Sequence, residues 1–191
     1  TGLRGATVDD IGRRGKFIVW SLVSADGEPV YLVIHLSRAG WIRWINNPSN
    51  TPPKPGRGPL ALRLAFADAG GEIVGGIDVT EAGTKKRLAI SVVTDPEEVP
   101  GIARLGPDPL APDFTQERLD AILDEAGGKQ IKGVLRSQSV IAGIGNAYSD
   151  EILHAARISP FAAAGRLTEE QRAALFATIR GQLFAAIARA A

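Results

Sequence analysis

The sequence contains no cysteine and no methionine, only two histidines, and no long apolar run. Without cysteine, the chain can form no disulfide, offer no thiolate nucleophile and bind no zinc through sulfur. Because His35 and His154 lie far apart in the sequence, a histidine-based metal site is not expected. No apolar stretch approaches the roughly 18 residues that cross a membrane, and the opening residues lack the apolar core of a signal peptide. We therefore expect no membrane partner, no metal in this chain and a cytoplasmic location.

Charge is nearly balanced in this chain of 191 residues, which is 45% hydrophobic, 23% charged and carries a formal net charge of +1. This composition is typical of a globular protein with one large domain or two small ones. The basic residues gather in four groups: Arg13, Arg14 and Lys16; Arg38 and Arg43; Lys85, Lys86 and Arg87; Lys129, Lys132 and Arg136. The balance neither demands nor excludes a polyanionic partner, because the distribution of charge matters more than its sum. Each basic group taken alone is best explained as a solvated surface.

The first half of the chain has the pattern of β-strands. Short apolar runs rich in β-branched and aromatic residues are joined by turn residues, of which Asp26-Gly27 is a typical hairpin pair. The predicted strands lie within residues 15–23, 29–37, 40–45, 60–79 (a second hairpin) and 87–93. Proline and glycine predict a loop over residues 46–59. Trp20, Trp41 and Trp44 are expected to pack within the β-layer. The pattern predicts a partial β-sandwich over residues 1–105.

The second half, residues 106–191, has the pattern of helices, so the fold class is α+β with strands first. The predicted helices cover residues 115–126, 129–138, 146–156 and 168–190. Thr115 is a candidate N-cap of the first, and Thr168 with Gln171 fits a capping box on the last. In that last helix Leu175, Ile179, Leu183 and Ile187 recur at four-residue spacing, which predicts one apolar face.

Two glycines and an asparagine precede a predicted helix in the stretch IAGIGNAYSDEIL. Gly143 and Gly145 permit a tight turn and a close backbone approach to a ligand. Asn146 can cap the helix or donate its amide to an oxygen atom. A helix N-terminus favours an anion, and Lys132 and Arg136 from the preceding segment could add positive charge. The sequence therefore predicts an anion site at this turn.

The residues alone do not decide which anion binds there. A dinucleotide-binding turn would need a third glycine where Tyr148 stands and a strand before the turn, so that alternative fails. The phosphate backbone of a nucleic acid fits, because helix N-termini commonly contact one. A corner between two helices, in which glycine only allows close packing, fits equally well. Asp150 and Glu151 point to different helix faces and are interpreted as first-turn charges that complement the helix dipole.

A longer stretch of this region resembles a known family. IKGVLRSQSVIAGIGNAYSDEILHAARISPFAAAGRLTEEQ is similar to the helix–two-turns–helix region of the formamidopyrimidine-DNA glycosylase and endonuclease VIII family, with its isoleucine-lysine run, its D/S-Q pair and its G-x-G-N-x-Y turn. Just upstream, LGPDPLAPDF resembles the family's linker between domains. RRGKFIVWSL and VYLVIHLSRAGWIRW resemble a strand pair of its first domain. The resemblance covers most of the chain, in the right order.

The resemblance implies a partner and a set of contact residues. In that family the turn asparagine and a strand lysine grip the phosphates that flank a flipped-out damaged base; these correspond to Asn146 and Lys16. Lys132 is a weaker candidate, and Gly145 and Tyr148 belong to the same turn. The implied partner is double-stranded damaged DNA of the nucleoid, without a small-molecule cofactor.

The turn HLSRAG resembles the family's loop that inserts a side chain into the vacated base stack. Arg38 stands where methionine is common, and an arginine can still fill space and stack. Many relatives carry a second inserting arginine in an Asp-Pro-Arg-Arg-Phe-Gly loop. The corresponding stretch here is DVTEAGTKKR, so that arginine is not carried over and Lys85 or Lys86 can only approximate it.

The family's chemistry requires groups that this sequence lacks. Its nucleophile is an N-terminal proline followed by a glutamate, whereas this chain opens Thr1-Gly2-Leu3, so no catalytic residue is assigned here. Relatives also continue into a zinc finger or a zincless hairpin, and zinc is expected only in an intact relative. We expect the sequence to be the central portion of a longer enzyme; a naturally reduced relative is the other explanation.

The leading hypothesis is a base-excision-repair DNA glycosylase with AP-lyase activity on oxidised or damaged bases, represented here by a portion without its nucleophile. A non-catalytic module that recognises damaged or bent duplex is the alternative. An RNA-binding protein is a third hypothesis, because a small-subunit ribosomal protein has a similar helical turn. The strand-rich first half and the HLSRAG turn argue against the RNA-binding hypothesis.

Overall fold

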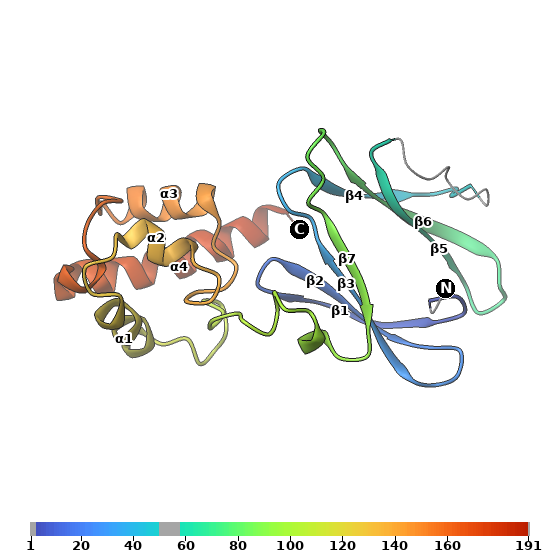
Figure 1. The fold of residues 1–191 in the computed structure, drawn as a ribbon, viewed down its shortest axis with the longest axis horizontal. Coiled ribbons are helices and arrows are strands. Elements are labelled where there is room, and N and C mark those ends of the chain that lie inside the picture. Colours follow the sequence, from blue (N-terminus) through green and yellow to red (C-terminus); the bar gives the residue numbers. More distant parts are fainter. Residues whose placement is uncertain (1–2, 50–57, 191) are drawn as a thin grey trace. The chain divides into compact units, whose positions relative to one another are not determined.

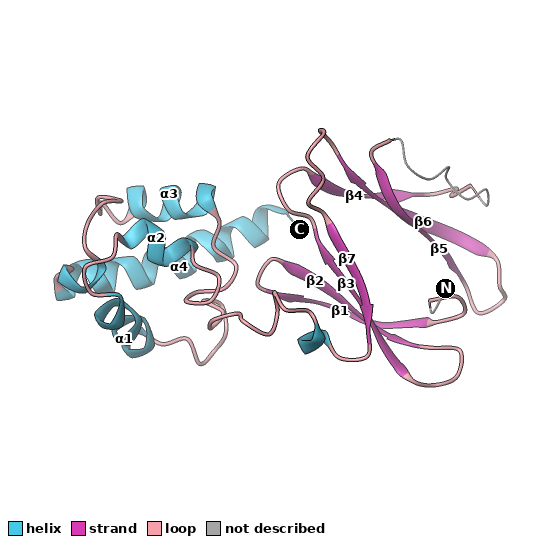
Figure 2. Cartoon of the chain, viewed as in Figure 1, coloured by secondary structure: helices cyan, strands magenta, loops and turns pink. Residues whose placement is uncertain are grey.

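The chain was analysed as a computed structural model that describes residues 3–49 and 58–190, so much of the predicted loop over residues 46–59 lies outside the described residues. Strands precede helices, which confirms the predicted α+β class (Figures 1 and 2). The contacts divide the chain into two compact units. The first consists of Thr1–Gly12 and Phe17–Asp95, and the second of Arg13–Lys16 and Pro96–Ala191.

Two antiparallel sheets form the first unit. The strands are β1 (Thr7–Arg14), β2 (Phe17–Val23), β3 (Pro29–His35), β4 (Gly40–Ile45), β5 (Leu60–Ala67), β6 (Ile73–Glu81) and β7 (Ala89–Val93). Within the described residues, one sheet has the order β1-β2-β3-β7 and the other the order β4-β6-β5. Alternate residues of each sheet face the other sheet, so that Trp20 and Leu32 share a core with Ile77 and Val79. The predicted β-sandwich is confirmed.

A glycine turn and stacked aromatic rings stabilise these sheets. β2 and β3 pair in the register Trp20↔Leu32, and Gly27 in the turn between them has φ +86, which glycine adopts without strain. Trp20 and Trp44 each stack on the ring of Phe66, at centroid distances of 5.8 and 5.9 Å. Both tryptophans therefore pack within the β-layer, as predicted. Trp44 keeps this contact although it is 54% exposed, whereas Trp41 is 65% exposed and stacks on no other ring in the described part of the chain. The expectation that Trp41 packs within the β-layer is therefore wrong.

The second unit is helical. Its elements are a 3-10 turn (Pro96–Glu98), α1 (Gln116–Ala126), α2 (Ile131–Arg136), α3 (Asn146–Ala155), a second 3-10 turn (Ala164–Arg166) and α4 (Glu169–Ala190). Thr115 accepts a hydrogen bond from the Arg118 amide at 3.3 Å, which confirms it as the N-cap of α1. The capping box on α4 is also confirmed, because the Thr168 amide donates to Gln171 Oε1 at 3.0 Å and the Gln171 amide donates to Thr168 Oγ1 at 3.3 Å.

All four helices contribute to one core, which includes Leu119, Leu135, Ile152 and Leu175. The predicted apolar face of α4 is buried at Leu175 and Ile179 but not at its end, since Ile187 is 53% exposed. The predicted apolar face is therefore buried in the first part of α4 and exposed at Ile187. No helix in the described part of the chain is both long and apolar enough to cross a membrane.

Candidate nucleic-acid interface

The turn between α2 and α3 is held by a single side chain. Gln138 Nε2 donates to the carbonyl oxygens of Arg136 at 2.9 Å and Ile144 at 2.8 Å, and its Oε1 accepts from the Gly143 amide at 3.0 Å. These three bonds satisfy backbone groups that the turn removes from helical hydrogen bonding. In the sequence, Gln138 marked only a family resemblance and no role was assigned to it.

Gly143 fits this turn because its φ of +90 strains any other residue. A Cβ at this position would lie 3.2 Å from Arg13 Nη1. Arg13 donates from Nη1 to the Gly15 carbonyl oxygen at 2.8 Å and from Nη2 to Asp108 Oδ2 at 2.6 Å. These contacts fix the tight turn after β1 within the helical unit.

Lys16 follows in this tight turn, and its ammonium lies beside the start of α3. A Cβ built on Gly145 would lie 3.4 Å from Lys16 Nζ. Partial burial, and to a lesser extent the positive charge of Arg136, lower the pKa of Lys16 below its ordinary value. Among the described residues, neither of these two cations has an ion-pair partner. The structure thus brings together two uncompensated positive charges at this turn.

The start of α3 adds neutral donors to these charges. Gly145 is the N-cap and offers no side chain to the amides of the first turn. Asn146 is the first helical residue, is exposed, and its side-chain amide has no partner among residues 3–49 and 58–190. The alternative in which Asn146 caps the helix is therefore wrong. Ser149 is buried and bonds through Oγ to the Asn146 carbonyl oxygen at 2.7 Å, which fixes the first turn.

Together, Lys16, Arg136, Gly145 and Asn146 form a candidate anion-binding cluster, which we call the α3 anion site. Two cations and one amide side chain surround a helix N-terminus whose dipole also favours negative charge. A phosphate group matches this combination of donors in charge and in hydrogen bonding.

Two other predicted contact residues are placed differently. Lys132 Nζ forms an ion pair with Asp150 Oδ1 at 2.6 Å. The first turn of α3 contains no acidic residue, so the interpretation of Asp150 and Glu151 as first-turn charges is wrong. Tyr148 is half-buried and packs against the helical core, so part of its ring is used in packing.

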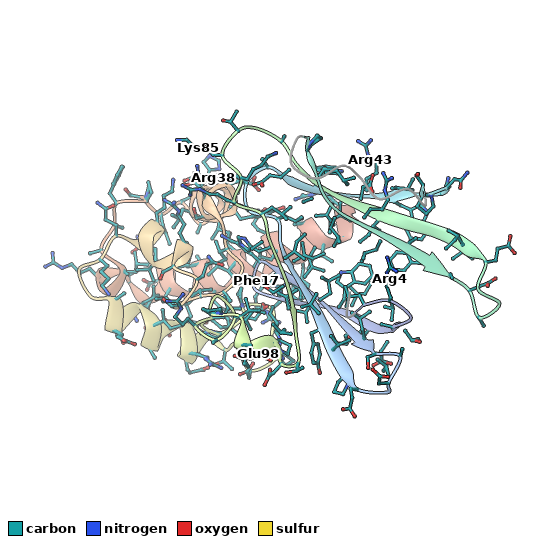
Figure 3. All side chains as sticks on the ribbon, turned by 45° about the vertical axis from the view of Figure 1, so that its right-hand side comes forward. Arg4, Phe17, Arg38, Arg43, Lys85 and Glu98 are labelled. Carbon is teal, nitrogen blue, oxygen red and sulfur yellow. The ribbon has the colours of Figure 1, made fainter. Side chains whose placement is uncertain are left out.

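Arg38 lies in the β unit, at the exposed tip of the turn between β3 and β4 (Figure 3). The turn is tight: the Gly40 amide donates to the Leu36 carbonyl oxygen at 2.9 Å, and a Cβ on Gly40 would lie 2.2 Å from that oxygen. Only glycine fits there, and Ser37 adopts a φ of +56. Arg38 is thus an exposed residue of a tight turn.

The segment after β6 lies next to this turn, because the Ala82 amide donates to the Ala39 carbonyl oxygen at 3.0 Å. The buried carboxylate of Glu81 holds the segment by accepting hydrogen bonds from the amides of Arg87 at 2.7 Å and Leu88 at 3.0 Å. Lys86 Nζ donates to the Glu81 carbonyl oxygen, so Lys86 serves as an internal brace. Lys85 is exposed and makes no such contact in the described part of the chain.

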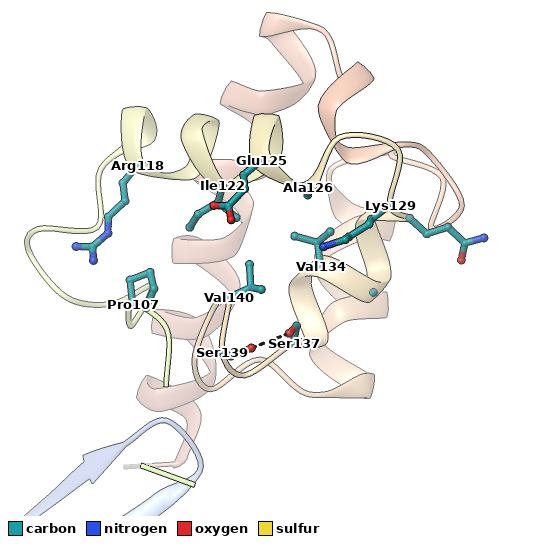
Figure 4. Close-up of a pocket in the computed structure, with 12 residues that line it drawn as sticks. Pro107, Arg118, Ile122, Glu125, Ala126, Lys129, Val134, Ser137, Ser139 and Val140 are labelled. Atoms are coloured by element: carbon teal, nitrogen blue, oxygen red, sulfur yellow. Dashed lines mark hydrogen bonds between the residues drawn. The ribbon is translucent and has the colours of Figure 1, made fainter. Parts of the chain in front are cut away.

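A separate cavity of about 650 Å³ opens beside α1 and α2 (Figure 4). Ile122, Val134 and Val140 form its apolar wall, and Glu125 and Lys129 are polar members of the lining. The residues predicted to contact DNA are not among those that line this cavity. The described residues also hold no group of three or more histidine, cysteine, aspartate or glutamate side chains that could bind a metal.

A β-sandwich is followed by helices, and a glycine turn between two of these helices leads into an uncapped helix N-terminus. This arrangement is that of proteins with a helix–two-turns–helix unit. Comparison with known families is consistent with this class. Residues 1–83 match the formamidopyrimidine-DNA glycosylase N-terminal domain, and residues 105–191 match the formamidopyrimidine-DNA glycosylase H2TH domain. The chain therefore belongs to the formamidopyrimidine-DNA glycosylase family.

Individual relatives agree with this assignment. The chain is 35% identical over 191 residues to the formamidopyrimidine-DNA glycosylase of Symbiobacterium thermophilum, with 98% of this chain and 56% of the relative covered. It is 38% identical over 176 residues to that of Moorella thermoacetica, with 91% and 58% covered. The structure of Lactococcus lactis Fpg in complex with DNA containing an abasic site superposes with a TM-score of 0.76 at 28% identity, covering 96% of this chain and 62% of that one. The chain thus spans little more than half the length of these curated relatives.

Proposed function

We propose that this chain is the duplex-binding portion of a base-excision-repair DNA glycosylase with AP-lyase activity, which acts on oxidised or otherwise damaged bases in double-stranded DNA. The α3 anion site is the observation that carries the proposal. Lys16 and Arg136 have no counter-charge there, although uncompensated cations that approach each other destabilise a fold unless an anion binds them. A DNA phosphate supplies that anion.

The proposed activity explains why such a site is needed. A glycosylase rotates its target base out of the helix, and this requires firm phosphate contacts on both sides of the resulting kink. Lys16, Asn146 and the amides at the start of α3 would provide one such contact. Arg38 at its rigid turn would fill the space that the base leaves, and Lys85 would act beside it. The Lactococcus lactis relative was solved on DNA with an abasic site, which is a product of base removal.

The reacting groups are proposed to lie outside these 191 residues. By resemblance to the family, a secondary amine at an N-terminal proline attacks the sugar C1′ and the following glutamate transfers protons. Any zinc centre of an intact relative would likewise lie outside the matched segment, because this chain has no cysteine. The residues described here bind and orient the duplex, and we propose that they need no small-molecule cofactor or membrane for that role.

The proposal is tested by binding to a fluorescent duplex that carries an abasic-site analogue, measured over a range of salt concentrations. Lys16→Ala removes one phosphate contact, so we expect weaker binding and a log–log salt slope that is flatter by about 0.9. Asn146→Ala removes an uncharged donor, so we expect weaker binding with an unchanged slope. Lys129→Ala is the matched control, because Lys129 is an exposed lysine of the same unit outside the α3 anion site. Unchanged affinity in both site variants would contradict the proposal.

A further inference from the structure

Asp150 and Lys132 form a close ion pair beside the α3 anion site. Asp150 lies four residues after Asn146 in α3, so the two side chains share one face of that helix. Lys132 comes from α2, and its Nζ lies 2.6 Å from Asp150 Oδ1. The Lys132 side chain is 28% exposed and that of Asp150 is 51% exposed, so solvent and a ligand can both reach the pair.

The cations around this turn differ in whether a carboxylate or a carbonyl oxygen already binds them. Arg13 is engaged by Asp108 and by the Gly15 carbonyl oxygen, and Lys132 is engaged by Asp150. Only Lys16 and Arg136, among the described cations named at this turn, have no such partner. A phosphate at the start of α3 would thus meet two free positive charges and, one helical turn further along, a carboxylate that neutralises a third.

We propose that Asp150 limits binding to undamaged DNA by holding Lys132 in an ion pair and away from the phosphate backbone. The inference rests on the proposed function. Contacts to phosphates strengthen binding to every duplex regardless of sequence or damage. A repair protein must find rare sites among a large excess of intact DNA, so an added nonspecific contact would trap it on the wrong sites. Asp150 acts as a specificity-determining residue through Lys132 and need not touch DNA itself.

The proposal makes opposite predictions for the two members of the pair. Asp150→Asn frees Lys132, so binding to an intact duplex should tighten and the salt slope should become steeper by about 0.9, as for one added phosphate contact. Between 50 and 200 mM salt the gain should then shrink about 3.5-fold. Lys132→Ala alone leaves the Asp150 carboxylate without its cation beside the α3 anion site, so binding to every duplex should weaken. The double variant Lys132→Ala/Asp150→Asn should show no gain, because the freed cation is absent.

Glu125→Gln provides the control for net charge. It removes one carboxylate from an exposed position on α1, outside the α3 anion site, and should not change the slope. The ion pair is partly exposed and contributes little to folding, so the variants should melt at the temperature of the parent chain.

Several results would overturn the inference. One is an unchanged slope in Asp150→Asn; another is a double variant whose slope is flatter than that of the parent chain by as much as in Lys16→Ala, because Lys132 would then contact phosphate despite Asp150. If Asn146→Ala and Lys16→Ala weaken binding while Asp150→Asn has no effect, only the inference about Asp150 fails. If the parent chain binds no duplex, both the inference and the proposed function fail.

Discussion

Gly143 and Gly145 are two residues apart, yet the structure assigns them different roles. Gly143 has a φ of +90, and a Cβ there would lie 3.2 Å from Arg13 Nη1. Gly145 has a φ of −106, which any residue adopts, and a Cβ there would make an ordinary contact of 3.4 Å with Lys16 Nζ. The first glycine is required by the backbone conformation, and we propose that the second leaves room for a phosphate at the start of α3.

Gly143→Ala should therefore destabilise the fold. The substitution forces a residue with a Cβ into the left-handed region and displaces the Arg13 guanidinium, for which we expect a loss of about 1–3 kcal/mol in the free energy of unfolding. Urea unfolding followed by circular dichroism measures this loss. A variant as stable as the parent chain would show that the turn relaxes to another conformation.

Gly145→Ala should leave stability nearly unchanged and weaken duplex binding. The added methyl group occupies space between Lys16 and the amides of α3, so a phosphate oxygen can no longer approach both. We expect a lower affinity at constant melting temperature, measured by fluorescence anisotropy and thermal unfolding. Equal affinity of Gly145→Ala and the parent chain would place the phosphate elsewhere.

The pKa of Lys16 offers a direct readout of the α3 anion site. Burial is the larger cause of its lowered pKa and the charge of Arg136 the smaller, so Arg136→Ala should raise the pKa only part of the way to the ordinary value of 10.5. A bound phosphate favours the charged form and should raise it further. Carbon-13 NMR of the labelled Lys16 side chain, with and without a short duplex, measures both shifts. A pKa that does not rise on duplex binding would contradict a phosphate contact at Lys16.

The lowered pKa of Lys16 also determines how the stability of the fold changes with pH. Between the lowered pKa of the folded state and the ordinary 10.5, the unfolded chain binds more protons than the folded chain at Lys16. The contribution of Lys16 to stability therefore increases with pH through that window. In Lys16→Met this part of the pH dependence should disappear, which denaturant titrations at several alkaline pH values would show.

At the residue scale, sequence patterns identified the turn before α3 but not the contacts that support it. Gly143, Gly145 and Asn146 were recognisable because two glycines and an asparagine before a helix predict a tight turn, whether or not a ligand binds there. Gln138 was not, because a glutamine carries no periodic signal and its three bonds depend on the folded turn. The pairing of Lys132 with Asp150 joins two helices, so spacing within either helix could not predict it.

At the scale of elements, the helix caps were the most predictable features, and they can be tested. Thr168→Ala removes the hydroxyl that accepts from the Gln171 amide, for which we expect a loss of about 1 kcal/mol. The Thr168 hydroxyl also lowers the pKa of Glu170, so this part of the stabilisation is present above the ordinary value of 4.5 and is lost as the pH falls through the folded-state value. The melting temperature of Thr168→Ala should therefore lie further below that of the parent chain at pH 7 than at pH 3. An equal difference at both values would show that Glu170 takes no part in the cap.

Elements without an apolar pattern escaped sequence analysis. β1 was not predicted, because all eight of its residues, Thr7–Arg14, are exposed and it lies at the edge of its sheet. Charged residues such as Asp9, Asp10 and Arg13 are typical of edge strands, where they oppose pairing with other chains. α4 shows the opposite limit: its apolar spacing continues to Ile187, but its buried core residues end near Ile179.

At the scale of the whole molecule, the duplex-binding residues and the chemistry are proposed to lie in different parts of a longer protein. The chain spans 56% to 58% of the two curated relatives described above. Within it, the α3 anion site depends on Arg13–Lys16, a short turn of the β region that belongs to the helical unit. The turn Arg13–Lys16 therefore has to be present with the helical unit for the site to form.

This separation predicts that binding and cleavage can be uncoupled. We expect the 191-residue chain to bind a duplex with an abasic site and to form no covalent adduct when borohydride is added, because the imine that borohydride reduces requires the proline amine. A version extended upstream to its natural start should form the adduct, and Asn146→Ala in that version should reduce its yield through weaker binding. Denaturing gel electrophoresis separates adduct from free DNA. An adduct with the 191-residue chain would place a nucleophile within it. Binding by both versions with no adduct from either would instead identify a relative that recognises damaged duplex without cleaving it.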